Sequence, residues 1–164
     1  MKLHLLILLG LIIAGNTFGQ KAKIDIFCRM VDSSLINENI ILHSVRHKTD
    51  FDAANTYDHY YIDTVKGKLV KSIYQFSFEG DGEYLEFYYR GVEIIRINAK
   101  QQLDKRKFAG SFYFKSNKLV AHTGGEISPG KIVFDLEKLL KTGNGYMNKL
   151  PEIIESLKNK NPIQ

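Results

Sequence analysis

The chain has 164 residues, with 23 Lys and Arg against 18 Asp and Glu, and a formal net charge of +5. This small excess, with both signs interspersed, argues against a nucleic-acid-binding protein. A single cysteine excludes an internal disulfide, so the fold depends on a core to which ten Phe and nine Tyr contribute.

The first 19 residues have the pattern of a cleavable secretory signal peptide. Lys2 supplies the basic start, an apolar run extends over Leu5–Ala14, and small or polar residues follow. A membrane-spanning helix needs roughly 20 apolar residues, so an uncleaved anchor is the less favoured alternative. We expect cleavage after Gly19, or one residue later at Gln20. The protein is then exported, to the periplasm or outside the cell, as one domain of residues 20–164 with no stable membrane span.

The mature chain opens with a helical period. Residues 22–37 carry apolar side chains at spacings of three and four, which predicts a helix. The apolar positions are Ile24, Phe27, Val31 and Leu35. Cys28 lies beside this stripe, and we expect it to be a buried structural thiol rather than a nucleophile. Residues 40–47 fit a strand as well as a continued helix.

From residue 56 to residue 122 the pattern changes to short runs of aromatic and β-branched residues separated by turn residues. This pattern predicts about six strands, and short connections force neighbouring strands to run antiparallel. The expected strands are residues 57–63, 68–78, 83–90, 93–99, 107–115 and 118–123. The result is an antiparallel β-meander.

Two segments of this region are similar to each other. Residues 87–96 align with residues 112–121 at a constant offset of 25 residues. The same offset leads back to residues 67–71, where the aromatic half is missing. Each unit consists of an aromatic strand, a tight turn and an aliphatic strand, which is one hairpin. Several hairpins side by side can bury a face that a single hairpin cannot, so the repeat predicts a fold rather than an activity.

The helical period returns near the C-terminus. Asp135 is placed to cap a short helix, which Gly143, Asn144 and Gly145 are expected to end. Pro151 suits the first turn of a second helix. The predicted fold class is therefore α+β, with an N-terminal helix, an antiparallel meander of about six strands, and one or two C-terminal helices packed on the sheet.

The histidines are the candidates for catalysis or metal binding. His43 and His47 share a face at a spacing of four, and His59 with nearby aspartates could complete a metal site. His122 lies near Glu126 beside a glycine turn, without a recognisable nucleophile. Because no motif is complete, we expect no catalytic residue, no metal and no cofactor. A hydrolytic or metal-dependent enzyme that uses these histidines is the alternative.

The aromatic hairpins provide one candidate binding face. Four rings are expected to share the core face, namely Phe87, Tyr89, Phe112 and Phe114. Tyr88 and Tyr113 alternate to the other face as half-exposed rings, flanked by Arg90 and Lys115. Such rings can bind a protein, a peptide or a glycan. Tyr88, Tyr113, Arg90 and Lys115 are therefore the predicted binding site of a non-enzymatic module. A secreted inhibitor is a further alternative.

The hairpin units, residues 87–91 and 112–120, resemble the aromatic hairpins of small uncharacterised exported proteins of Gram-negative bacteria. They are less closely similar to MORN-like hairpin repeats. Both resemblances imply a sheet of hairpins, which in the exported proteins follows a helix like the one expected at Ile24–Leu35. The turns differ, since Gly91-Val92 and Asn117-Lys118 stand where those hairpins have Asn-Gly. The resemblance brings no functional residue to this chain.

Overall fold

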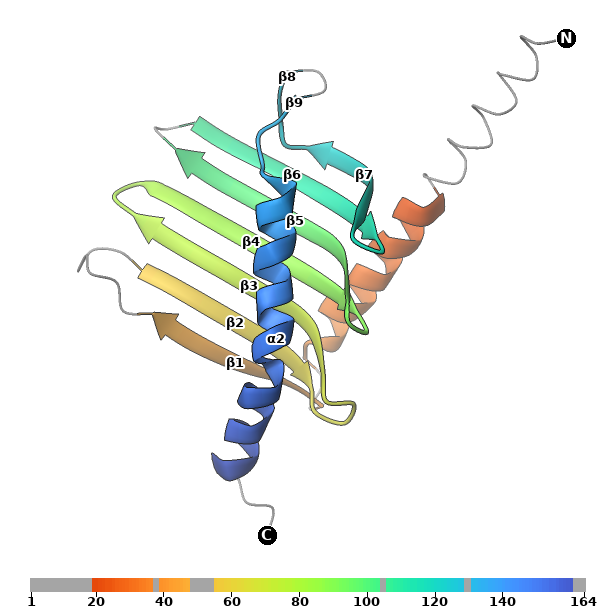
Figure 1. Cartoon of the computed structure of the whole chain (residues 1–164), viewed down its shortest axis with the longest axis vertical. Coiled ribbons are helices and arrows are strands. Elements are labelled where there is room, and N and C mark those ends of the chain that lie inside the picture. Colours follow the sequence, from red (N-terminus) through yellow and green to blue (C-terminus); the bar gives the residue numbers. More distant parts are fainter. Residues whose placement is uncertain (1–18, 37–38, 48–54, 104–105, 129–130, 161–164) are drawn as a thin grey trace, which may run out of the picture.

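The computed structural model describes residues 19–36, 39–47, 55–103, 106–128 and 131–160. A helix over residues 19–34, the N-terminal helix, precedes the sheet, and α2 (Leu136–Lys160) follows it (Figure 1). The strands of the main sheet are β1 (Ile40–His47), β2 (Asn55–Asp63), β3 (Lys68–Phe78), β4 (Asp81–Arg90), β5 (Glu93–Leu103), β6 (Arg106–Lys115) and β7 (Lys118–Gly124). The predicted signal peptide lies outside the described residues, apart from Gly19.

The main sheet is an antiparallel meander in the order β1-β2-β3-β4-β5-β6-β7, as expected. It has seven strands instead of about six, because residues 40–47 pair with β2 rather than continue the helix. The first helix also begins and ends three residues earlier than expected. Two short strands, β8 (Glu126–Ser128) and β9 (Lys131–Ile132), form a separate pair.

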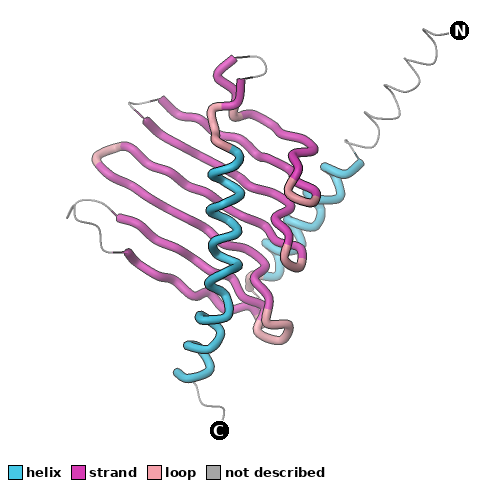
Figure 2. The backbone as a smooth tube through the Cα atoms, in the orientation of Figure 1, coloured by secondary structure: helices cyan, strands magenta, loops and turns pink. Residues whose placement is uncertain are grey.

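The two helices cover opposite faces of the sheet, which gives three layers (Figure 2). The face under α2 carries the aromatic core, and the four rings predicted to share it are 0–1% exposed: Phe87, Tyr89, Phe112 and Phe114. The N-terminal helix packs Ile24, Cys28 and Val31 against the other face. The helices therefore lie on the aromatic sheet, as predicted from their apolar stripes.

The prediction of two C-terminal helices separated at Gly143 is wrong, since α2 is continuous over 25 residues and contains Pro151. Gly143 is needed for packing rather than for a turn. A Cβ atom there would lie 2.6 Å from Cδ1 of Ile94 and 2.7 Å from Cδ1 of Phe87. The Tyr89 hydroxyl also donates a hydrogen bond to the Gly143 carbonyl at 2.9 Å. Among the described residues, no helix has an apolar stretch of the length that crossing a bilayer requires.

Three hairpins of the sheet have a β-bulge at the equivalent position. The register shifts leave Val70, Ile95 and Val120 as extra residues, one just after each hairpin turn. These positions are 25 residues apart, and all three side chains pack in the cluster under the N-terminal helix. A β-bulge turns an additional side chain to one face of the sheet. Each hairpin thereby gives this helix an aliphatic contact.

Candidate functional site

The structure does not leave the predicted binding rings half-exposed. Tyr88 is 2% exposed and Tyr113 is 3% exposed, because the N-terminal helix covers both. Arg90 and Lys115 are exposed at the strand ends, and the Arg90 guanidinium lies 4.6 Å from the centre of the Phe27 ring. Alternation placed the two tyrosines on the correct face, but it could not show that a helix lies on them.

Beneath this helix, cations and tyrosine rings alternate across four strands. The register aligns Lys71 with Tyr88, Tyr88 with Arg96, and Arg96 with Tyr113. The Lys71 ammonium lies 4.9 Å from the centre of the Tyr88 ring, and the Arg96 guanidinium lies 5.6 Å from both tyrosine rings. Cation–π contacts of this kind are strongest where water is excluded. We call these four residues the cation–tyrosine row.

Two aspartates of the helix bind this row. Asp32 accepts hydrogen bonds from the Lys71 ammonium at 2.8 Å and the Tyr88 hydroxyl at 2.9 Å. Asp25 accepts from Arg96 at 3.2 Å and from the Tyr113 hydroxyl at 2.9 Å. The two aspartates are seven residues apart, which is a distance of about 10.5 Å along the helix axis. Tyr88 and Tyr113 are two strands apart, which is a distance of about 9.6 Å across the sheet. This match fixes the helix in one position on the sheet.

Asp25 makes the docking of the helix depend on pH. Burial alone would raise the pKa of Asp25, but hydrogen bonds from Lys21 and Tyr113 and the charge of Arg96 outweigh it and lower that pKa. A lowered pKa contributes stability above the carboxyl's unfolded value of about 4, and this contribution is lost as the pH falls through the folded value. We expect the urea midpoint to fall below about pH 4, and to fall less in Asp25→Asn.

The same measurement has an internal reference. The pKa of Asp63 is also lowered, chiefly by a hydrogen bond from the backbone of Lys66. Asp25 is not among the groups that shift it, so we expect the Asp25→Asn substitution to leave this contribution in place. The difference between the two pH profiles therefore reports Asp25 alone. Parallel profiles below pH 5 would contradict this account of how the helix is held.

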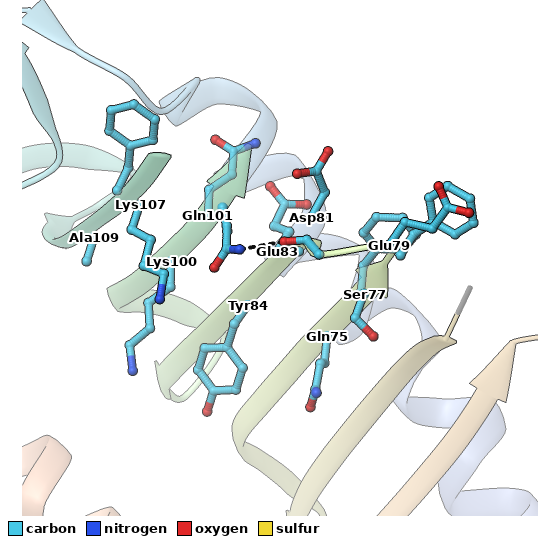
Figure 3. Close-up of a pocket in the computed structure, with 16 residues that line it drawn as sticks. Gln75, Ser77, Glu79, Asp81, Glu83, Tyr84, Lys100, Gln101, Lys107 and Ala109 are labelled. Atoms are coloured by element: carbon cyan, nitrogen blue, oxygen red, sulfur yellow. Dashed lines mark hydrogen bonds between the residues drawn. The ribbon is translucent and has the colours of Figure 1, made fainter. Parts of the chain in front are cut away.

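Beside the N-terminal helix, three hollows adjoin one another. The middle hollow shares Glu86, Arg96 and Asn98 with the hollow next to the helix. It shares Tyr84 and Lys100 with a hollow of about 640 Å³ at the end of the sheet (Figure 3). We call the surface formed by these five residues, with Ala109 and Ser111 of β6 beside them, the open groove. It lies on β4, β5 and β6, between the N-terminal helix and the hollow at the end of the sheet.

The floor of the open groove is a continuous hydrogen-bonded network. Glu86 forms an ion pair with Lys71 at 2.6 Å and accepts a hydrogen bond from the Asn98 amide. The Asn98 carbonyl oxygen accepts from Arg96 and from the Ser111 hydroxyl, both at 2.8 Å. Side chains that fix one another in this way lose little further freedom when a ligand binds.

Tyr84 forms one wall of the open groove. Burial, with the charge of Glu86, raises the pKa of the Tyr84 phenol to about 12, so the hydroxyl is neutral. The ring is only partly buried, and the exposed Lys100 ammonium lies 5.6 Å from its centre. Figure 3 shows Gln75, Tyr84 and Lys100 pointing to the same side of the sheet. Small residues on β6, Ala109 and Ser111, leave room beside them.

The candidate histidines divide between the two faces of the β1–β2 pair. His47 contacts the Asp58 carboxylate at 2.7 Å, and Asp58 also accepts a hydrogen bond from the Tyr146 hydroxyl of α2. Ser44 and His59 form a pair at 2.8 Å. Ser44 is three residues from His47 on β1 and His59 is one residue from Asp58 on β2, so this pair lies on the opposite face. The Ser–His pair and the His–Asp pair thus cannot combine into a catalytic triad.

The remaining candidates also have structural surroundings. His122 stacks on the Phe112 ring with 6.4 Å between centres, and the side chain of its suggested partner Glu126 lies outside the description. The predicted burial of Cys28 is confirmed, at 1% exposed, and burial raises the pKa of its thiol to about 11. Within the described ranges no three His, Cys, Asp or Glu residues gather as metal ligands.

The fold and the open groove define an α+β protein in which one helix covers each face of a seven-stranded meander. Comparison with known proteins adds no relative to this description: no family model, curated protein or solved structure matches the chain.

Proposed function

We propose that the protein is an exported, non-enzymatic module that binds a partner through the open groove. The observation that carries the proposal is the fixed network of Glu86, Asn98 and Arg96 at the floor of a solvent-facing groove. Concave surfaces with a few convergent polar groups are the usual places where proteins bind ligands. The signal-peptide pattern supports a periplasmic or extracellular location.

The groove replaces the site first predicted at Tyr88 and Tyr113. Those rings contact the chain's own helix, so a partner reaches them only if the helix moves. Tyr84 has the properties expected of the predicted site, namely a partly exposed ring beside charged groups on the same face. A role as a secreted inhibitor stays a prediction, and it would use a surface of the same kind.

Two separate contacts favour the alternative of a hydrolytic or metal-dependent enzyme, the Ser44–His59 pair and, more strongly, the contact between His47 and Asp58. A carboxylate that orients an imidazole is part of many catalytic sites. Here the other oxygen of Asp58 accepts from Tyr146, which anchors α2 to the sheet. The contact therefore has a structural explanation, and the binding proposal has the better support.

Capture from an envelope extract of a Gram-negative bacterium tests the proposal. We expect the wild-type protein to retain a partner that Tyr84→Ala loses by about tenfold, because an aromatic anchor at a binding site contributes on the order of 1–2 kcal/mol. Tyr57→Ala is the matched control, since Tyr57 lies on the same face in line with Gln75 and Tyr84 but outside the groove.

Two results would count against the groove as the binding site. One is equal recovery of the partner by the wild-type protein and Tyr84→Ala. The other is recovery that falls with Tyr57→Ala as much as with Tyr84→Ala. Circular dichroism of each variant checks that the sheet is intact. Tyr84→Phe should retain binding, because it keeps the ring and removes only the hydroxyl.

A further inference from the structure

We propose that the occupant of the open groove is a neutral oligosaccharide, an inference that rests on the proposed function and gives it a ligand class. The first argument is charge. At the floor of the groove Glu86 is paired with Lys71 at 2.6 Å, and Arg96 is paired with Asp25 at 3.2 Å. A charged ligand on this floor would compete with ion pairs that already exist, whereas a neutral hydroxyl-rich ligand would not. The exposed ammonium of Lys100 lies at the wall, 5.6 Å from the centre of the Tyr84 ring, and the polygalacturonate titration below measures whether it attracts an anion.

The second argument is the geometry of the donors and acceptors. A guanidinium has five N–H donors and a carboxylate has about four acceptor positions, so the bonds within the described network leave part of this capacity for a ligand. Glu86, Arg96 and Asn98 each end in a planar group that presents neighbouring hydrogen-bonding atoms. Adjacent hydroxyl groups of a sugar ring match such pairs of atoms, because each hydroxyl both donates and accepts.

The third argument is the ring of Tyr84 beside this network. One face of a pyranose ring is largely C–H surface, which packs on a flat aromatic ring. Tyr84 and Glu86 are two residues apart on β4 and point to the same side of the sheet. A sugar on the Tyr84 ring would therefore reach Glu86 and Asn98 with its hydroxyl groups. From Gly82 to Glu86 the open part of the strand spans ~13 Å, enough for at least two sugar units.

A peptide fits this surface less well. Peptides that extend a sheet pair with the backbone of an edge strand. The groove lies on β4, β5 and β6, whose backbone groups are engaged in ladders on both sides. The edges of the main sheet are β1 and β7, and two strands separate each of them from β4, which carries Tyr84. On the groove a peptide would meet side chains alone.

Titration of the ¹⁵N-labelled protein with cellohexaose, chitohexaose and maltohexaose, followed by NMR, tests this inference. We expect at least one of them to shift the amide signals of Tyr84, Asn98 and Ser111 in a saturable manner. Tyr84→Ala should weaken that binding by about tenfold and Tyr84→Phe by less than about threefold, because the ring and not the hydroxyl packs on the sugar. Tyr57→Ala should leave the dissociation constant unchanged within about twofold.

The outcomes separate the ligand class from the site. No saturable shift with any of the three sugars, while an envelope partner is still lost by Tyr84→Ala, would overturn the oligosaccharide and leave the groove as the binding site. Tighter binding of polygalacturonate than of every neutral sugar would also overturn it, since the ligand would then be anionic. Shifts that gather around Tyr57 and not Tyr84 would overturn both proposals.

Discussion

Gly143→Ala should lower the free energy of unfolding by about 2 kcal/mol or more, although alanine is the better helix former. The new Cβ atom would lie 2.6 Å from Ile94 and 2.7 Å from Phe87, whose side chains are 0% exposed and have no room to move. To relieve the overlap, α2 must shift away from the sheet. This shift would also lengthen the 2.9 Å hydrogen bond from Tyr89 to the Gly143 carbonyl. Urea unfolding, monitored by circular dichroism, measures the loss.

The same helix offers a matched control two residues further on. A Cβ atom at Gly145 would meet nothing within 4 Å. Gly145→Ala should therefore raise the free energy of unfolding by about 0.5–1 kcal/mol, the usual gain for this exchange in a helix. If both substitutions stabilised the protein, the close contact between α2 and the sheet would be contradicted.

Lys71→Met should cost about 3 kcal/mol, the second large effect we expect. Burial alone would lower the pKa of the Lys71 ammonium, but hydrogen bonds to Asp32 and Glu86 outweigh it and raise that pKa, so Lys71 is charged. Methionine keeps an unbranched side chain that is one atom shorter, and it removes the charge. Glu86 is 14% exposed and would lose its 2.6 Å ion pair. The loss is large because an uncompensated charge then stays in a poorly hydrated place.

Lys68→Met is the control for this variant. Lys68 lies on the same strand and is exposed, and surface changes of this kind stay within about 0.5 kcal/mol. Because Lys71 also binds Asp32, the variant should weaken the docking of the N-terminal helix. Trypsin should then cut within residues 19–34 sooner than in the wild-type protein. Equal unfolding midpoints for Lys71→Met and Lys68→Met would mean that the ion pairs contribute little.

The strands could be predicted from the sequence because they depend on interactions between residues that are close in the chain. Short connections such as Gly91-Val92 force antiparallel neighbours, and alternation places Phe87 and Tyr89 on one face and Tyr88 on the other. Both faces of the hairpins are apolar near the turns, which agrees with the two helices found there. After each turn the sequence has two adjacent aliphatic residues, as in Ile94-Ile95, and the bulges at Val70, Ile95 and Val120 explain this break in the alternation.

The site could not be predicted in the same way, because it depends on which part of a face a helix covers. Nothing local distinguishes Tyr84 from Tyr88, which are four residues apart on β4 and point to the same side. Only the position of the N-terminal helix makes one ring open and the other buried. The available signal was on the helix itself, where Asp25 and Asp32 lie on the same side as the apolar stripe. Acidic residues on that side indicate cationic or hydroxyl partners beneath it.

In the main sheet, every strand pairs only with its neighbours in the chain, and this has a consequence for how the protein folds. Each ladder can close soon after its turn forms, so the search for the correct pairing is short and the loss of chain entropy is spread over small steps. The contacts that join distant parts of the chain are made by the two helices, for example Tyr113 with Asp25. We therefore expect the hairpins to form first during folding. The two helices should dock on the sheet last, in the slow and reversible step of folding.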